Sequence, residues 1–222
     1  ISTFRDSGGL WDEYDVSVVC QANSLEKNES LTIEFYNKRR LELERKKANH
    51  AHKIIAQLKE QYGNDIAVIT QNVDNLFEKG GIPQKDVIHL HGFMQEVRCR
   101  NQECASVFNI GYKKQEDFHF GYCPTCESKL RPNIVFFGEG APMYEKLYKE
   151  IEDCLLLIVI GTSGNVINTD ELTQHVPKNI LNNLEPSSAI FDKLYSKVLY
   201  KPATKAIDEI ADDIHTLFST CK

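Results

Sequence analysis

The sequence lacks any long hydrophobic run, and no apolar stretch approaches the roughly 20 residues that a membrane-spanning helix needs. The chain also shows no basic start and apolar core of the kind that marks a secretory signal peptide. Basic side chains are outnumbered, with 26 Lys and Arg against 32 Asp and Glu, and a net charge of -6 gives no general attraction to nucleic acid or anionic membranes. We therefore expect a cytoplasmic protein with no direct nucleic-acid or membrane partner, and we expect it to be a monomer.

The sequence also lacks the cysteine pattern of a secreted disulfide scaffold. Its seven cysteines are an odd number, and Cys20, Cys154 and Cys221 stand alone. This usage is typical of a reducing compartment. At 222 residues, 41% of them hydrophobic, the chain can bury a full core, as one large domain or as one domain with a smaller insertion.

The other four cysteines form two close pairs. Four residues separate Cys99 from Cys104, two separate Cys123 from Cys126, and eighteen lie between the pairs. This spacing predicts one tetrahedral zinc site, and four thiolates leave no open position, so the zinc would be structural. The alternatives are four unrelated buried thiols or a zinc ribbon that binds nucleic acid, which the acidic chain disfavours. Residues 94–132, which contain the site, have no apolar periodicity and are interpreted as an inserted module.

Strand and helix patterns alternate through the rest of the chain. Two short β-branched runs, residues 66–69 and 87–90, are typical of strands buried on both faces. Asn49 is expected to cap a helix that ends at Gly63. Further strands are expected at residues 133–137, 155–160, around 180–181 and 197–200, and further helices at 25–47, 142–154 and 203–218. The sequence therefore predicts an α/β fold with a mostly parallel sheet and helices on both of its faces.

Polar residues follow the two β-branched runs directly. Gln71, Asn72 and Asp74 come after the first, and His91 comes after the second. In an open parallel sheet, ligands bind beyond the carboxyl ends of the strands, where these side chains are expected. A lone histidine at a strand end is more often structural, as we expect for His89, and Asp74 could simply cap the next helix.

Six short motifs in a fixed order resemble the sirtuins, the NAD-dependent protein lysine deacylases. FRDSGGLW, TQNVD, HG, the four-cysteine module, FFGE and GTS appear in the order of that family, followed by NLEPS and a Pro-Ala pair. The resemblance covers essentially the whole chain. It implies a Rossmann-like NAD-binding domain at residues 1–19, 59–95 and 133–222. It also implies a small domain made of a helical part at residues 20–58 and the zinc module at residues 96–132.

The resemblance also implies the roles of individual residues. His91 would be the general base that takes a proton from a ribose hydroxyl, and Asn72 would assist it. NAD would be held by Phe4, Arg5, Gln71, Asn72, Asp74, Gly161, Thr162, Ser163, Asn183, Glu185 and Ala203. The acyl-lysine protein or peptide would be held by Tyr36, Arg39, Val135, Phe137, Gly138 and Glu139. Products would be free lysine, nicotinamide and O-acyl-ADP-ribose.

Tyr36 and Arg39 carry the most specific prediction. Their spacing of three on a helix puts both on one face, where the guanidinium can pair with a carboxylate and the phenol can add a hydrogen bond. This Tyr-x-x-Arg pattern resembles the class III sirtuins, which recognise succinyl, malonyl or glutaryl lysine. The alternative is that Arg39 belongs to a solvated Lys-Arg-Arg run.

One departure from the family concerns the pyrophosphate. Sirtuins begin with a strand and a Gly-Ala-Gly-x-Ser loop, which nothing in this sequence matches. Either the sequence is a fragment or the protein binds NAD poorly. We expect a further strand upstream of Ile1, because a sheet without it would expose apolar surface. The alternatives to an acidic-acyl deacylase are a plain deacetylase, a mono-ADP-ribosyltransferase, or a module that binds acyl-lysine or NAD metabolites without turnover.

Overall fold

The structure, a computed structural model, describes residues 15–220 in two units. The first contains residues 15–47, 69–76 and 89–143, and the second contains residues 48–68, 77–88 and 144–220. These bounds reflect which residues pack together. The functional division into an NAD-binding domain and a small domain stays a prediction. No helix in residues 15–220 is long and apolar enough to span a membrane.

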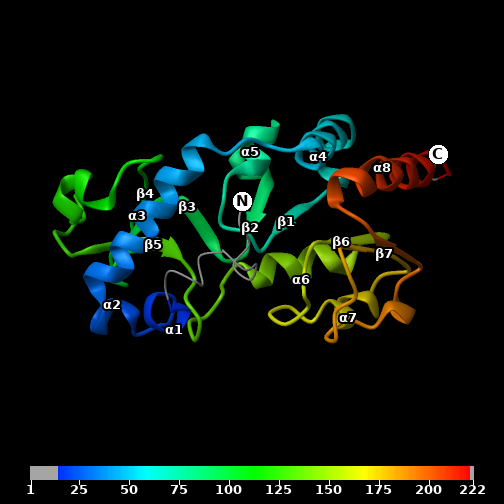
Figure 1. Cartoon of the computed structure of the whole chain (residues 1–222). Helices are drawn as coiled ribbons and strands as arrows, with labels where there is room; N and C mark the ends of the chain where they lie inside the picture. The colour runs from blue at the N-terminus through cyan, green and yellow to red at the C-terminus, as the bar shows by residue number, and fades with distance from the viewer. Residues whose placement is uncertain (1–14, 221–222) are drawn as a thin grey trace. The chain divides into compact units, whose positions relative to one another are not determined.

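An antiparallel sheet organises the first unit (Figure 1). β3 (Gly92–Cys99) lies between β4 (Val107–Asn109) and β5 (Leu130–Ile134), with Gly92 opposite Ile134 and Cys99 opposite Leu130. One expectation is wrong here. The strand expected at 133–137 runs from Leu130 to Ile134. The arginine, proline and asparagine inside β5 give it no apolar run in the sequence, although Arg131 and Pro132 are buried.

The helices of the first unit are α1 (Val16–Val19), α2 (Ser24–Lys27) and α3 (Glu29–Arg45). The single helix expected at 25–47 is broken at Asn28, whose backbone is not helical (φ -138°, ψ 41°). In α3, Leu31 is exposed, whereas Arg40 is fully buried. Arg40 donates from Nε to the Met94 carbonyl at 2.7 Å, so it joins α3 to β3. Burial lowers the pKa of Arg40 to about 10, which still leaves it charged at neutral pH.

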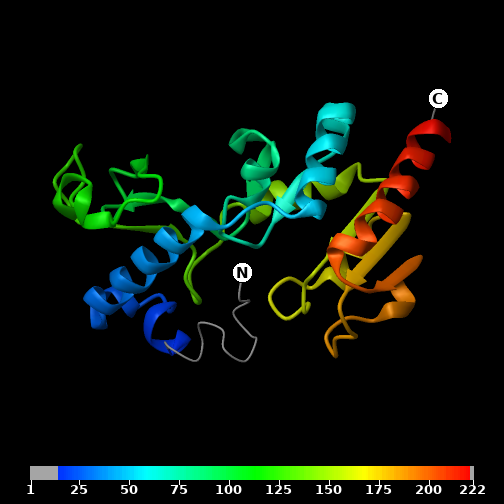
Figure 2. The ribbon, with the colours of Figure 1, turned by 45° about the horizontal axis from the view of Figure 1, so that its top comes forward.

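A parallel sheet organises the second unit, in the order β6 (Leu156–Ile160), β7 (Lys178–Asn183) and β8 (Lys197–Tyr200). Successive β6 residues face opposite sides of the sheet, and each side packs into a separate core. Ile158 packs with α4 (His50–Tyr62) and α8 (Ala203–Thr220), whereas Val159 packs with Ile190 and Tyr195. α8 runs along one face of the sheet beside α4 (Figure 2). The sheet is therefore buried on both faces, as the continuous apolar strands predict.

The remaining elements are short. β1 (Val68–Thr70) and β2 (Val87–His89) form a two-stranded sheet, so both β-branched runs are strands as predicted. α6 (Tyr144–Glu152) confirms the helix expected at 142–154, and α7 (Thr169–Thr173) was not expected. The other elements are α5 (Leu76–Gly80) and the 3-10 turns Gly63–Asp65, Gln84–Asp86, Gln115–Asp117, His119–Gly121 and Asp192–Leu194.

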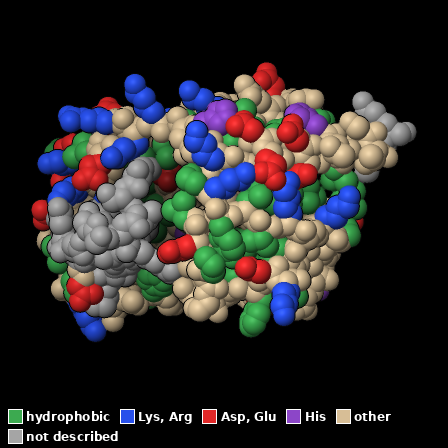
Figure 3. All heavy atoms as spheres, turned by 45° about the vertical axis from the view of Figure 1, so that its right-hand side comes forward, with side chains coloured by type: hydrophobic (Ala, Val, Ile, Leu, Met, Phe, Trp, Pro, Cys, Tyr) green, Lys and Arg blue, Asp and Glu red, His purple; other side chains and the backbone are tan. Residues whose placement is uncertain are grey.

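The surface view in Figure 3 shows basic and acidic side chains interspersed. In the second unit, Lys197 lies 2.6 Å from Asp213 and 2.8 Å from Glu209, and Lys201 lies 2.6 Å from Glu209. These opposite charges neutralise each other on this part of the second unit.

The cap of α4 gives a test of the local fold. Asn49 Oδ1 accepts the His52 backbone N–H at 3.2 Å, and His52 Nδ1 accepts the Asn49 N–H at 3.3 Å, which completes a capping box. We expect Asn49→Ala to lower the free energy of unfolding by about 1 kcal/mol in urea titrations. Asn64→Ala, an exposed site just beyond the same helix, is the control. Equal effects of the two changes would contradict the cap.

Candidate functional site

His91 lies just after β2, half-buried, in the first unit. Its Nδ1 lies 3.0 Å from the carbonyl oxygen of Gln71. A carbonyl only accepts, so Nδ1 carries the proton and Nε2 of the neutral ring carries the lone pair. Burial lowers the pKa of His91 below its ordinary value, and the bond to Gln71 offsets part of that shift. The ring is therefore neutral at pH 7 and can accept a proton at Nε2.

The other polar residues after β1 lie close by. Asp74 Oδ1 accepts the N–H of Leu76 at 3.0 Å, so this carboxylate caps α5, as the simpler interpretation predicted. Asn72 is exposed, and its backbone N–H donates to the Thr70 hydroxyl at 3.0 Å. The structure thus brings Gln71, Asn72 and His91 to the ends of two paired strands.

His89 differs from His91. It is buried, and its ring lies 4.7 Å from that of Phe93. Its Nδ1 lies 3.4 Å from the Asn72 carbonyl oxygen. These contacts fit the structural role expected for this histidine.

Gly92 allows His91 to reach its place. Its φ is +93°, and a Cβ there would lie 2.0 Å from the carbonyl oxygen of Asn133. Only glycine fits this close approach of β3 to β5. The N–H of Val135 then donates to the His91 carbonyl at 2.9 Å, which ties the residues after β5 to the histidine.

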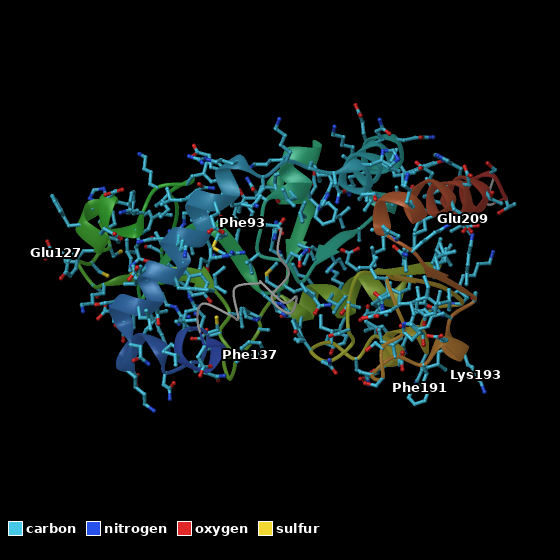
Figure 4. All side chains as sticks on the ribbon, viewed as in Figure 1. Phe93, Glu127, Phe137, Phe191, Lys193 and Glu209 are labelled. Atoms are coloured by element: carbon cyan, nitrogen blue, oxygen red, sulfur yellow. The ribbon has the colours of Figure 1, made fainter. Side chains whose placement is uncertain are left out.

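Residues 135–139, expected to hold the substrate peptide, form an irregular segment after β5. The Phe137 N–H donates to the Cys20 carbonyl at 2.8 Å, and the Phe137 carbonyl accepts from Ala22 at 2.9 Å. Phe137 is half exposed, and Gly138 is exposed with a φ of +88° (Figure 4). Glu139 is different, because its carboxylate is bound by arginines of the same unit.

A shallow hollow of about 390 Å³ opens beside this segment, and all of its lining residues belong to the first unit. It is lined by Val18, Gln21, Ala22, Asn23, Lys27, Asn28, Phe137 and Gly138.

Tyr36 faces the interior rather than solvent. Its hydroxyl lies 3.4 Å from the sulfur of Cys20, and its ring stacks on Phe136 at 5.5 Å with an interplanar angle of 9°. Burial raises the pKa of Tyr36 well above its ordinary value, so the phenol stays protonated. Cys20 and Phe136 were not predicted as site residues, because their contacts to Tyr36 depend on tertiary packing.

Arg39 is not part of a solvated charge run. Its side chain is only 13% exposed, and Nη1 pairs with Glu42 Oε2 at 2.9 Å. Together with the full burial of Arg40, this contradicts the simpler interpretation of the Lys-Arg-Arg run.

In the second unit, the residues expected to hold NAD follow the ends of β6 and β7. The Asn183 amide makes two bonds to the backbone of Thr162, accepting its N–H at 3.1 Å and donating to its carbonyl at 2.9 Å. Ser187, the last residue of the NLEPS motif, donates to the Ser163 carbonyl at 2.6 Å. Asn183 therefore fixes the turn that begins at Gly161, where φ is +66°. Its side chain holds protein backbone, and its contact with NAD stays a prediction.

The remaining NAD residues are spread over the chain. Glu185 is exposed after β7, and Ala203 begins α8 directly after Pro202. The motif residues Phe4 and Arg5 lie outside the described residues.

The four predicted cysteines converge in the first unit. The sulfur atoms of Cys99, Cys104, Cys123 and Cys126 all lie within 4.8 Å of one another, and the Cys99–Cys126 and Cys104–Cys123 distances are 3.4 and 3.7 Å. A tetrahedral zinc with bonds of about 2.3 Å would separate its sulfur ligands by about 3.8 Å. The four thiols therefore fit a structural zinc, as predicted, and the ion would join the β3–β4 turn to residues 123–126.

A model of the Sir2 family matches residues 1–168 of the chain. The NAD-dependent protein deacylase of Campylobacter jejuni strain RM1221 is 47% identical, over 96% of this chain and 89% of its own length. The NAD-dependent protein deacylase of Helicobacter hepaticus is 38% identical, over 98% of this chain and 92% of its own length.

Solved structures of Sir2 homologues are also similar to this chain. A Sir2 homologue bound to ADP-ribose superposes with a TM-score of 0.84 at 29% identity, over 99% of this chain and 87% of that one. A Sir2 homologue bound to NAD superposes with a TM-score of 0.81 at 28% identity, over 97% of this chain and 83% of that one. Sir2 bound to an acetylated peptide superposes with a TM-score of 0.74 at 26% identity, over 90% of this chain and 84% of that one. These likenesses confirm the predicted α/β fold.

The protonation of His91 gives a pH test. Its pKa is lowered, so the neutral ring persists as the pH falls and is lost only below the ordinary histidine value of about 6.5. We expect the acid limb of kcat/KM for any turnover of NAD to have its midpoint below 6.5. His50→Gln, a change at a half-exposed histidine, should not move that limb. A midpoint above 6.5 would contradict the assignment of His91.

Metal removal tests the cysteine cluster. A structural zinc contributes about 10–16 kcal/mol of binding free energy, so its loss should unfold the module. We expect one zinc per chain by atomic emission, and rapid proteolysis between residues 100 and 128 after chelation. Cys104→Ser should lose the metal, whereas Cys154→Ser, outside the cluster, should keep it. Full zinc content in the Cys104 variant would contradict the site.

Proposed function

The chain belongs to the Sir2 family, and we propose on this basis that it removes succinyl or malonyl groups from protein lysine. NAD-dependent protein deacylation is the activity for which its relatives are named, and it is the activity of this protein. The preference for an acidic acyl group is the proposed part. The observation that supports it is Arg39, a mostly buried cation three residues from Tyr36 on α3.

His91 supports the deacylase chemistry. NAD supplies the ribose whose C1′ accepts the acyl oxygen as nicotinamide leaves. We propose that His91 Nε2 then takes the proton of a ribose hydroxyl, because the Gln71 carbonyl fixes the proton on Nδ1. Burial keeps the ring neutral at pH 7, which is the form that can accept this proton.

Arg39 and Tyr36 can exchange their present partners for a carboxylate. Glu42, the partner of Arg39, is 42% exposed, so solvent weakens that ion pair. The Tyr36 hydroxyl contacts the Cys20 sulfur, and a thiol is a weak hydrogen-bond partner. An acyl carboxylate that reaches both groups would gain a charge-assisted bond from Arg39 and a second bond from Tyr36.

A plain deacetylase is the second candidate, because Sir2 structures with acetylated peptides superpose on this chain. An acetyl group has no carboxylate, so it would leave Arg39 paired with Glu42. The two candidates therefore differ in how turnover depends on the charge of Arg39.

We expect Arg39→Met to lower the ratio of kcat/KM for succinyl-lysine to kcat/KM for acetyl-lysine by about ten- to a hundredfold. The reason is that the variant loses one charged hydrogen bond, which is worth about 1.5–3 kcal/mol. Glu42→Gln removes the competing carboxylate and should raise desuccinylation. Arg45→Met, in the last turn of the same helix, is the matched control. An Arg39→Met protein that still preferred succinyl-lysine would defeat the proposed preference.

A further inference from the structure

We propose that Arg131 and Glu139 are positioning residues that hold residues 135–139 in shape for the acyl-lysine substrate. The proposal rests on the proposed deacylase function. It replaces the expected direct contact of Glu139 with substrate by an indirect action through the backbone.

The Glu139 carboxylate is fully engaged inside the first unit. Arg131 donates Nη1 to Oε1 at 2.5 Å and Nη2 to Oε2 at 3.0 Å, which is a bidentate pair. Oε2 also accepts the backbone N–H of Phe136 at 2.9 Å and lies 3.4 Å from Nη2 of Arg98. With four donors on two oxygens, this carboxylate has little capacity left for a ligand.

Arg131 acts on the neighbouring aromatic residues as well. Its guanidinium carbon lies 4.3 Å from the centre of the Phe136 ring, and that ring stacks on Tyr36. A second bond runs from Arg131 Nη2 to the Ile134 carbonyl at 3.2 Å. One buried guanidinium therefore fixes the carboxyl end of β5 and, through Phe136, the ring of Tyr36.

The segment held in this way is tied to His91. Val135 donates to the His91 carbonyl, and Phe137 donates to the Cys20 carbonyl, at 2.9 and 2.8 Å. Between Phe136 and Glu139 the chain turns, with the Glu139 N–H donating to the Phe136 carbonyl at 3.0 Å. This turn exposes Phe137 and Gly138. The ion pair thus sets the position of the two residues that are exposed for a peptide.

The simpler explanation is that the pair only stabilises the first unit. Arg100 and Glu29 form an ion pair of that kind, 2.7 Å apart and remote in sequence from residues 135–139. Arg100→Lys is therefore a matched control for Arg131→Lys. Both changes keep the charge and remove a planar guanidinium, and the Arg131 change also removes a bidentate pair.

The test measures steady-state kinetics and backbone hydrogen exchange on the whole protein, with a succinyl-lysine and an acetyl-lysine peptide. We expect Arg131→Lys and Glu139→Gln to raise the KM of both peptides at least tenfold, with the KM of NAD changed less than twofold. Amide exchange in residues 134–139 should accelerate at least tenfold. Arg100→Lys should do neither, even if its melting temperature falls equally.

A peptide KM within twofold of wild type in both Arg131→Lys and Glu139→Gln would overturn the proposal. Unchanged exchange of residues 134–139 would also overturn it, because the effect would then not act through the segment. If the wild-type protein turned over neither peptide, the proposed function would fail, and the exchange rates would still decide whether Arg131 holds the segment. Zinc content and melting curves identify any variant that does not fold.

Discussion

The pairing of β3 with β5 is the constraint on which the first unit depends. At one end it places Cys99 opposite Leu130, which brings the two cysteine pairs together around one point. At the other end it places Gly92 opposite Ile134, so His91 accepts a bond from Val135. The pairing of β3 with β5 thus links the cysteine cluster to the histidine, although its register shifts between Gly92 and Val97. A structural zinc at the cluster would order the β3–β4 turn at the far end of this pairing.

Hydrogen bonds to the backbone hold several groups in place where the chemistry needs them fixed. A carbonyl fixes the tautomer of His91, and the Asn183 amide fixes the turn after β6. Arg131 and Glu139 fix the residues after β5. Each arrangement restrains residues that follow the carboxyl end of a strand. The rule that ligands bind at such ends applies to the parallel sheet of β6, β7 and β8, whereas β5 lies in an antiparallel sheet. The pre-ordered groups lose little entropy when a substrate binds, which is the advantage of holding them before it arrives.

The sequence predicted what depends on short-range pattern. The cap at Asn49 and the strands around Val159 and Leu181 were correct, and the four cysteines converge as predicted, because periodicity, capping and ligand spacing are local. What it missed depends on contacts distant in sequence. β5 was misplaced because buried Arg131 breaks its apolar pattern. The engaged carboxylate of Glu139 could be known only from its partners.

Identifying the products is the most direct test of the central claim, that this protein transfers an acyl group from lysine to the ribose of NAD. The protein is incubated with NAD and a succinyl-lysine peptide, and the mixture is analysed by mass spectrometry. The account predicts equal amounts of free-lysine peptide, nicotinamide and O-succinyl-ADP-ribose. Free succinate formed without O-succinyl-ADP-ribose, or a peptide that carries ADP-ribose, would contradict it.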